Sequence, residues 1–349
     1  MYCEAITEFG KPLQRVEGPT PTPSGTEVLV RVEHCGVCHS DVHIHDGYFD
    51  MGGAAKMPLG LPLPHTLGHE VAGEVIAVGP DADPALIGQH RALYSWIGCG
   101  KCAACVRGEE NYCNAPRNLG CSAGVGGGYA SHVVIPDPKY LIDYGNVPPA
   151  LAATYMCSGL TAYGAMKKVP KLGEKDDVLI IGAGGVGMMG VQFAKHLTGK
   201  GPLVADIDEG RLQAAMGAGA KAAYNTKDPE ALKKLMADTE GGAVGVVDFV
   251  GSESSFAFAN QAVRRGGRVI IVGLFGGGMA MPIPMFPFRA LTIGGSYVGS
   301  LAEAEEMMEM VRAGKIDPIP VREAPLSAAS DVLTELREGK VVGRVVLVP

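Results

Sequence analysis

The sequence has no stretch rich in lysine and arginine, and its acidic residues outnumber its basic ones. With 37 aspartates and glutamates against 30 lysines and arginines, the formal net charge is −7. Proteins that bind nucleic acid through its phosphates need a basic surface. The charge balance therefore predicts no nucleic-acid partner.

The chain also lacks the features of secretion and of membrane insertion. Residues Met1 to Glu4 hold no basic segment followed by an apolar run, so we expect no signal peptide and a cytoplasmic location. The longest uncharged stretch, Val269 to Phe288, contains three consecutive glycines and three prolines, which exclude a continuous membrane-spanning helix. In a reducing compartment, the nine cysteines favour metal-binding thiolates over disulfides.

No internal repeat divides the chain, but its hydrophobic pattern changes along its length. A chain of 349 residues exceeds the size at which one hydrophobic core usually stops growing, so we expect two domains. From residue 28 to about 142, short β-type runs alternate with turns, which is typical of antiparallel sheet. From about 157 to 295, apolar runs separated by helix-length segments predict a doubly wound parallel sheet.

The tail after Ser296 contains one helical segment near 302–313 and a β-like run at 343–348. We assign this tail to the first domain. The sequence thus predicts an α/β protein with a β-rich domain at 1–157, a parallel-sheet domain at 158–295 and a C-terminal segment at 296–349 that returns to the first domain.

A glycine turn follows the apolar run at 178–181. Gly182, Gly184 and Gly187 fit the pattern G-x-G-x-x-G, with Gly185 and Val186 inside it and a helical pattern after it. The glycines permit a tight turn, close approach of a pyrophosphate and close packing of helix on strand, and the helix N-terminus faces the anion. The alternative, a glycine turn without a ligand, agrees less well with this order of strand, turn and helix.

An acidic residue supports a dinucleotide at this turn. Asp206 lies 24 residues after Gly182, at the end of the next apolar run, where a carboxylate accepts hydrogen bonds from the ribose hydroxyls. The same carboxylate repels a 2′-phosphate, which favours NAD over NADP. Arg211 complicates this preference because it is basic and close in sequence, although it can also lie over the adenosine of NAD.

Four cysteines form a compact group with the spacing C-x2-C-x2-C-x7-C. They are Cys99, Cys102, Cys105 and Cys113. Four thiolates saturate a tetrahedral zinc ion and leave no open position, which indicates a structural site. An iron–sulfur cluster also takes four cysteines, but nothing else in the chain indicates electron transfer.

Three further residues of types that bind metals are scattered along the sequence. They are Cys38, His69 and Cys157. Their spacing alone is equally compatible with buried cysteines and a core histidine.

The order of the motifs supplies what the spacing does not. Cys38-His-Ser-Asp41, Gly68-His-Glu70, the four cysteines, Cys157-Ser-Gly-Leu-Thr-Ala-Tyr163, the glycine turn and Ser296-Tyr-Val-Gly299 follow one another along nearly the whole chain. In this order they resemble the zinc-containing medium-chain alcohol dehydrogenases. The resemblance implies a GroES-like catalytic domain, a Rossmann domain, NAD, and two zinc ions per chain.

The resemblance also implies roles for individual residues. Cys38, His69 and Cys157 hold the catalytic zinc, with Glu70 beside it as a supporting or transient ligand. Two thiolates, an imidazole and an open position make a Lewis acid that lowers the pKa of an alcohol. Asp41 is expected to orient His69 through its other ring nitrogen.

Further implied roles concern the proton and the cofactor. Ser40 relays the alcohol proton outward, His39 and Arg344 lie near the pyrophosphate, and the Val298 backbone lies near the nicotinamide. Well-known members of the family continue the relay to a histidine, and in this chain the corresponding position is Asp46. The relay is expected to end at Asp46, with His45, His43 or water as alternatives.

The substrate is the least determined feature. The largely apolar segment 47–64, with Trp96 and Met156, favours a medium-sized aliphatic or aromatic alcohol over a polyol. The chain's opening and the Gly47–Gly53 stretch resemble bacterial 6-hydroxyhexanoate dehydrogenases. This resemblance adds a further candidate substrate, an ω-hydroxy acid whose carboxylate pairs with Lys56.

The alternatives to an alcohol dehydrogenase are a zinc-free enoyl or quinone reductase and a noncatalytic NAD- and zinc-binding protein. Members of the family that the chain resembles are usually dimers or tetramers, so we expect a homo-oligomer.

Overall fold

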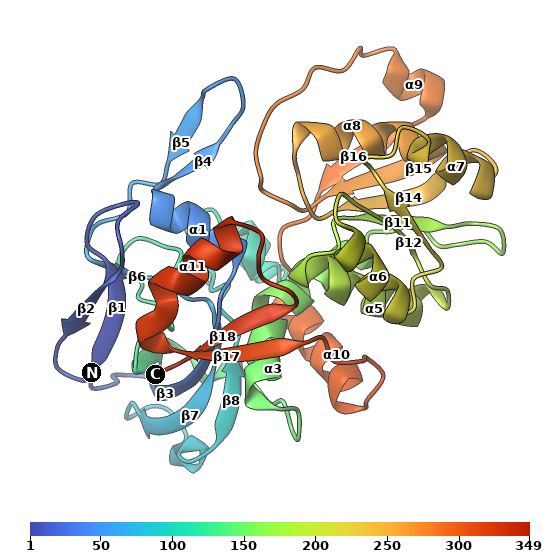
Figure 1. Ribbon diagram of the computed structural model, residues 1–349. Helices are drawn as coiled ribbons and strands as arrows, with labels where there is room; N and C mark the ends of the chain where they lie inside the picture. Colours follow the sequence, from blue (N-terminus) through green and yellow to red (C-terminus); the bar gives the residue numbers. More distant parts are fainter. The chain divides into compact units, whose positions relative to one another are not determined.

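The computed structural model describes all 349 residues, which form two compact units. The first unit comprises 1–48, 58–160 and 299–349, and the second comprises 49–57 and 161–298. The chain therefore leaves the first unit after residue 160 and returns to it at residue 299 (Figure 1).

The first unit is built on a seven-stranded sheet. Along its main path the strand order is β10-β8-β7-β3-β18-β17, and β9 also pairs with β3. The bounds are β3 Val28–Gly36, β7 Glu70–Val78, β8 His90–Leu93, β9 His132–Ile135, β10 Leu141–Ile142, β17 Val321–Pro325 and β18 Arg344–Val348. All pairs are antiparallel except β17 with β18. The expectation of antiparallel sheet in this part of the chain is confirmed.

Smaller elements surround this sheet. A three-stranded sheet has the order β2-β1-β6, with β1 at Tyr2–Ile6, β2 at Gln14–Glu17 and β6 at His65–Thr66. The helices are α1 His39–Asp46, α2 Ala103–Val106, α3 Pro149–Thr154, α10 Leu301–Arg312 and α11 Ala329–Arg337. The short 3-10 turns are η1 Pro84–Leu86, η2 Glu110–Tyr112, η3 Pro138–Tyr140 and η5 Leu326–Ala328. After α3 the chain continues through η4, Tyr155–Gly159, into α4, Leu160–Met166.

The second unit has a six-stranded parallel sheet in the order β13-β12-β11-β14-β15-β16. Numbered from β11, this order is 3-2-1-4-5-6, the doubly wound arrangement that binds dinucleotides. The strands are β11 Val178–Ile181, β12 Leu203–Asp206, β13 Ala222–Asn225, β14 Ala243–Asp248, β15 Val263–Ile271 and β16 Thr292–Gly295. The helices are α5 Gly185–Thr198, α6 Glu209–Gly217, α7 Ala231–Asp238, α8 Glu253–Ala262 and α9 Met285–Arg289. The predicted parallel sheet is confirmed.

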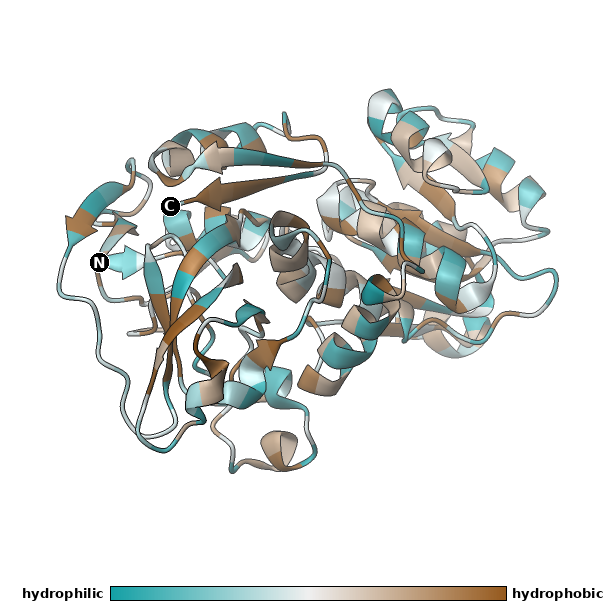
Figure 2. Cartoon of the chain, turned by 90° about the horizontal axis from the view of Figure 1, so that it is seen from below, coloured by the Kyte–Doolittle hydropathy of each residue, from teal (hydrophilic) through white to brown (hydrophobic).

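The core of the second unit explains why the sheet strands are nearly continuous apolar runs. Strands β11, β12 and β14 are buried along their whole length, because helices cover both faces of the sheet. Figure 2 shows strand segments in brown beside helices in which teal and paler residues alternate with brown ones. The hairpin of β4, Tyr48–Asp50, and β5, Lys56–Pro58, groups largely with this unit, although sequence order places it in the first domain.

No helix in the structure is both long and apolar enough to cross a bilayer. The uncharged stretch from Val269 instead runs through the end of β15 and the loop that leads to α9.

Candidate active site

Strand pairing brings two of the scattered metal-ligand candidates together. Antiparallel β3 and β7 are in register with Gly36 opposite Glu70. Cys38 follows β3 by two residues and His69 immediately precedes β7, so both lie at the same end of this pair. Cys38 and His69, which are 31 positions apart in the sequence, are therefore neighbours in the fold.

The third candidate, Cys157, lies in the middle of η4, a single π-helical turn between α3 and α4. Such turns insert a residue into a helix and re-aim the side chains around it, and they are frequent at functional sites. The Cys157 sulfur lies 3.9 Å from the Cys38 sulfur. The extra residue in this π-turn changes the direction of the Cys157 side chain and so helps to place its sulfur in the site.

The resulting group has the donor set of a metal site. Ligand atoms of Cys38, His69, Glu70 and Cys157 all lie within 4.8 Å of one another, and all four residues are buried. Both ring nitrogens of His69, Nδ1 and Nε2, are buried without a hydrogen-bond partner. A buried polar atom without a partner is costly. Two thiols and an unpartnered imidazole nitrogen fit a zinc ion.

Asp41 organises this group from behind. Its Oδ1 lies 3.3 Å from the Nδ1 of His69, and both side chains are fully buried. Its Oδ2 accepts a 2.9 Å hydrogen bond from the backbone N–H of Cys38 and a 3.3 Å bond from the Tyr129 hydroxyl. One carboxylate therefore fixes the start of α1 and faces the histidine ring. The sequence indicated Asp41 but not Tyr129, which is distant in sequence and has no motif around it.

A second buried carboxylate, Glu70, is held by two partners. Arg344 of β18 donates to it over 2.5 Å and the Ser158 hydroxyl over 2.7 Å. Burial raises the pKa of Glu70, while the Arg344 charge opposes that rise. Gly36 leaves the room that this side chain needs, because a Cβ atom there would lie 2.0 Å from a Glu70 oxygen. Ser158 was not identified from the sequence.

The two site cysteines differ in their readiness to ionise. The hydrogen bond between their sulfurs lowers the pKa of Cys38 well below its ordinary value and raises that of Cys157. Two thiolates at this distance repel each other, so ionisation of one disfavours ionisation of the other. A divalent cation would remove that conflict by stabilising both thiolates.

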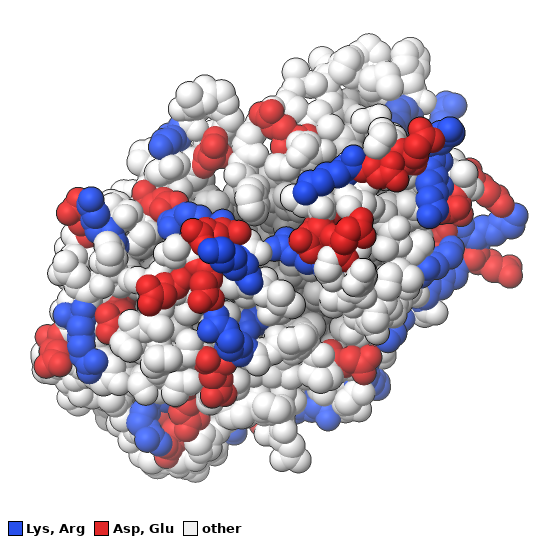
Figure 3. Space-filling model, viewed as in Figure 1, with Lys and Arg blue, Asp and Glu red and all other residues white.

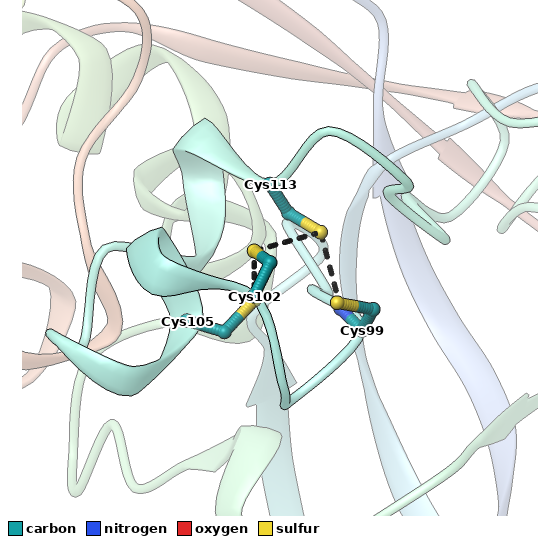
Figure 4. Close-up of side chains that lie close together, drawn as sticks. All are labelled: Cys99, Cys102, Cys105 and Cys113. Carbon is teal, nitrogen blue, oxygen red and sulfur yellow. Dashed lines mark hydrogen bonds between the residues drawn. The ribbon is translucent and has the colours of Figure 1, made fainter.

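The four-cysteine lobe brings its sulfurs together around α2 and η2, as Figure 4 shows. The Cys102 sulfur lies 3.5 Å from that of Cys105 and 3.8 Å from that of Cys113. Zinc–sulfur bonds of about 2.3 Å in a tetrahedron place sulfurs about 3.8 Å apart. Hydrogen bonding from the Cys105 backbone contributes most to lowering the pKa of Cys102 to about 6. The lobe therefore fits a zinc ion.

A buried carboxylate, Glu110 of η2, attaches this lobe to η3. It accepts hydrogen bonds from the Gly98 backbone at 2.9 Å, the Tyr140 hydroxyl at 2.5 Å and the Lys139 ammonium at 2.7 Å. Sequence reasoning missed Glu110 because an isolated glutamate inside a cysteine motif has no signal of its own. The three hydrogen-bond donors that surround it come together only in the folded lobe.

The glycine turn has the geometry that its pattern predicted. Gly182 has a φ of 88°, which favours glycine, and a Cβ atom on Gly187 would lie 1.7 Å from the Gly182 carbonyl oxygen. Helix α5 begins at Gly185, so its first amides are free to face an anion. Asp206 ends β12 and is buried, and its Oδ2 accepts a 2.7 Å bond from the Ala183 N–H. The carboxylate thus lies against the turn itself.

The remaining sequence candidates lie in varied surroundings. Ser40 and His39 form the partly exposed first turn of α1, and Asp46, the last residue of α1, pairs with Arg337 at 2.6 Å. Trp96 is buried, donates to the Met156 carbonyl at 3.1 Å and packs edge-on against His69.

Three other candidates belong to the second unit. Val298 is buried with a φ of 49°, a conformation that costs energy for a β-branched residue and often marks a functional position. Arg211 is partly buried in α6, and Lys56 is exposed at the start of β5.

Comparisons with known proteins agree with this geometry. Residues 24–145 match the alcohol dehydrogenase GroES-like domain, and residues 185–313 match the zinc-binding dehydrogenase domain. The NAD-dependent alcohol dehydrogenase of Sulfurisphaera tokodaii is 35% identical over the full length of both chains. An alcohol dehydrogenase of Geobacillus stearothermophilus is 31% identical over 99% of this chain and 98% of its own. The crystal structure of the Aeropyrum pernix alcohol dehydrogenase superimposes on this chain with a TM-score of 0.90. The two sequences are 30% identical, and the match covers the full length of both chains.

The fold and the two thiol-rich groups define a two-domain, zinc-binding dehydrogenase. The chain belongs to the zinc-type medium-chain alcohol dehydrogenase family. Its activity is the NAD-linked interconversion of alcohols and carbonyl compounds.

Proposed function

We propose that each chain holds two zinc ions, one catalytic and one structural. The catalytic ion is assigned to Cys38, His69 and Cys157, with Glu70 as a supporting or transient ligand. The observation that carries this assignment is the unpartnered, buried Nε2 of His69 between two cysteines. The structural ion is assigned to the four-cysteine lobe, whose four thiolates leave no open position.

A zinc ion held by these two thiolates and the imidazole would supply Lewis acidity that lowers the pKa of an alcohol, and NAD held at the glycine turn would supply the hydride acceptor. The protein's own residues prepare this site. Asp41 holds the Nδ1 side of His69, which leaves Nε2 for the metal. Arg344 and Ser158 hold Glu70, so that this carboxylate keeps a fixed place beside the thiolates.

The alcohol proton is proposed to leave through Ser40, which lies two residues after Cys38 on the first turn of α1. Among the later positions, Asp46 is bound by Arg337 and the Nε2 of His45 contacts the Lys11 carbonyl at 2.7 Å. The relay is proposed to end at Asp46, with His43, His45 or water as the alternatives.

The cofactor contacts are assigned from the turn and from the family resemblance. The amides of Gly184, Gly185 and Val186 face the pyrophosphate, with His39 and Arg344 adding positive charge. Asp206 accepts from the adenosine ribose once it releases the Ala183 amide, and Arg211 covers the adenosine. Backbone groups of Val298 contact the nicotinamide carboxamide.

The substrate is proposed to be a medium-sized primary or secondary alcohol. Trp96 presents an apolar ring beside His69, which favours an aliphatic or aromatic chain over a polyol. An ω-hydroxy acid is a further candidate because Lys56 is an exposed cation on the β4–β5 hairpin.

Turnover of an alcohol panel tests this assignment. We expect NADH formation with primary, secondary, aromatic and ω-hydroxy-acid alcohols, and its loss with a zinc chelator. Zinc analysis is expected to give two ions per chain, and one in Cys157→Ser. Chelator-resistant turnover, or one zinc ion in the unaltered enzyme, would contradict the catalytic site. Lys56→Ala should raise the KM of the ω-hydroxy acid but not that of a neutral alcohol of equal length.

The surroundings of the chain are proposed from its surface and thiols. Six of the nine cysteines lie in the two metal-binding groups, which favours a reducing compartment such as the cytoplasm. A homo-oligomer is favoured by an apolar surface on the second unit, where Phe275, Ile283 and Phe288 are 58%, 81% and 68% exposed. In Figure 3 this area, at the upper right, is almost free of charged side chains.

Strand β16 gives that surface a second property. It is the edge strand of the parallel sheet, so one side of its backbone has no partner within the chain. An edge strand next to exposed apolar side chains is a template for pairing with another chain. A second copy that adds its own β16 would satisfy both features.

A further inference from the structure

A buried carboxylate lies immediately beside the nucleotide turn and has no role in the functions assigned above. Asp248 is the last residue of β14, and its backbone is in register with Ile181, which precedes Gly182 on β11. Its exposed fraction is 0%. Because both strands end at the ligand-binding edge of the sheet, Asp248 lies where the cofactor turn begins.

The Asp248 carboxylate accepts three hydrogen bonds from the loop and helix that follow it. Its Oδ1 accepts from the backbone N–H groups of Val250 at 2.9 Å and Gly251 at 3.0 Å. Its Oδ2 accepts from the Ser255 hydroxyl of α8 at 2.8 Å. Burial raises the pKa of Asp248, and these hydrogen bonds oppose the rise. The carboxylate thus fixes the path of residues 249–251.

Residues 249 and 250 form one wall of the glycine turn. A Cβ atom on Gly182 would lie 2.6 Å from the Val250 Cγ2, and one on Gly190 would lie 2.7 Å from the Phe249 ring. The Phe249 N–H also donates to the Ile181 carbonyl at 2.9 Å. The turn and the loop are therefore in close contact.

The other side of the loop is fixed equally closely. A Cβ atom on Gly251, whose φ is 68°, would lie 1.9 Å from the Gly273 carbonyl oxygen. The Asp248 carbonyl accepts from the N–H groups of both Val272 and Gly273. The ends of β11, β14 and β15 are thereby joined around one aspartate.

We propose that Asp248 is a positioning residue for NAD, acting through Val250 to hold the Gly182 turn in its phosphate-binding shape. The carboxylate does not touch the cofactor in this proposal. A loosened 249–251 loop would allow the turn to relax, and part of the binding free energy of NAD would then be spent on re-forming it. The inference rests on the family's use of NAD.

The test compares NAD binding by the full-length zinc-loaded protein and its variants, measured by calorimetric titration. Asp248→Ala should weaken NAD binding by about tenfold, or about 1.4 kcal/mol, and raise the KM for NAD. The kcat at saturating NAD and the KM for alcohol should not change. Asp248→Asn should restore binding, because its amide oxygen accepts the same two backbone N–H groups.

Two further variants separate positioning from general stability. Ser254→Ala, one residue from Ser255 but without a bond to Asp248, should bind NAD like the unaltered protein. Val250→Ala keeps the carboxylate but removes the wall against Gly182, and should weaken NAD binding even if Asp248→Ala fails to fold. Normal NAD affinity in folded Asp248→Ala or in Val250→Ala would overturn the proposal. An unaltered protein that binds no NAD would instead contradict the assigned cofactor.

Discussion

At the scale of single residues, buried carboxylates do most of the positioning in this protein. Asp41 faces His69 and caps α1, Glu70 sits between Arg344 and Ser158, and Asp248 ties down the loop beside the glycine turn. Each is fully buried. A buried carboxylate is stable only when donors or cations surround it, so each one also fixes its neighbours.

The first prediction concerns Asp41. Asp41→Asn keeps the side-chain shape but removes the charge that faces the Nδ1 of His69. Loss of such a partner typically lowers metal affinity or activity by about 10- to 100-fold. We expect catalytic zinc to be lost at chelator concentrations that the unaltered enzyme withstands, while the four-cysteine site stays filled. Zinc analysis and NADH formation check this.

Asp81→Asn is the matched control for that experiment, because Asp81 is exposed and is not one of the grouped metal-ligand residues. Equal zinc retention in Asp41→Asn and Asp81→Asn would contradict the role given to Asp41.

At the scale of elements, the four-cysteine lobe depends on one anchor besides its metal. The lobe contains only a short helix and a 3-10 turn, and three of its four cysteines are partly exposed. Glu110 links it to Gly98, Lys139 and Tyr140. A small lobe of this kind gains little from hydrophobic burial, so metal and hydrogen bonds carry its stability.

The anchor gives a prediction for stability and its pH dependence. Burial by itself would raise the pKa of Glu110, but the bonds from Lys139, Tyr140 and Gly98 lower it overall below 4.5. A lowered folded pKa stabilises the fold above the unfolded pKa, and this contribution is lost as the pH falls through the folded value. Glu110→Gln should therefore cost about 1–3 kcal/mol at neutral pH.

The difference between Glu110→Gln and the unaltered protein should shrink as the pH falls below about 4.5. Urea unfolding at several pH values measures it. Glu109→Gln is the control, because the side chain of the neighbouring Glu109 is 41% exposed and pairs with Arg107. If the free energy of unfolding had the same pH dependence in Glu110→Gln as in Glu109→Gln, the stabilising role of Glu110 would be contradicted.

At the scale of the whole molecule, an apolar surface is left uncovered by the chain itself. Helix α9 has no buried residue, and its side chains include Met285, Phe286 and Phe288. Single exposed apolar residues are ordinary, but a cluster beside an unpaired edge strand indicates an interface.

The corresponding prediction concerns assembly. Phe288→Glu places a charge in this surface and should convert the oligomer to a smaller species, because a charge buried in an apolar interface has no partner. Light scattering after size-exclusion chromatography measures the mass. Val342→Glu, at a residue that is 75% exposed outside this surface, should leave the mass unchanged. A chain that is monomeric before substitution, or unaffected by Phe288→Glu, would exclude this interface.

Local patterns could be predicted from the sequence because their chemistry is contained in short segments. The four cysteines span 15 residues, and the glycine turn lies between a strand and a helix that adjoin it. Alternation of apolar runs with helix-length segments likewise predicted the parallel sheet, because each run must be buried between helices. Neither result needed contacts between distant parts of the chain.

Long-range arrangements could not be predicted in the same way. The hairpin lies within the first domain in sequence, but its residues 49–57 group with the second unit, where Gly52 lies against the backbone of Gly277 and Gly278. Such backbone contacts involve no side-chain pattern that a single sequence displays. The ion pair between Asp46 and Arg337 likewise joins residues almost 300 positions apart.

The sequence by itself determined the class of fold, the zinc-type dehydrogenase family and which residue types carry the chemistry, because these follow from local spacing and from the order of motifs. Only the tertiary structure decided how Cys38, His69 and Cys157 meet, through the register of β3 with β7 and the π-turn at η4. It alone also identified the partners of Asp41, Glu70, Glu110 and Asp248. Burial makes those partners obligatory, and burial is a property of the folded chain.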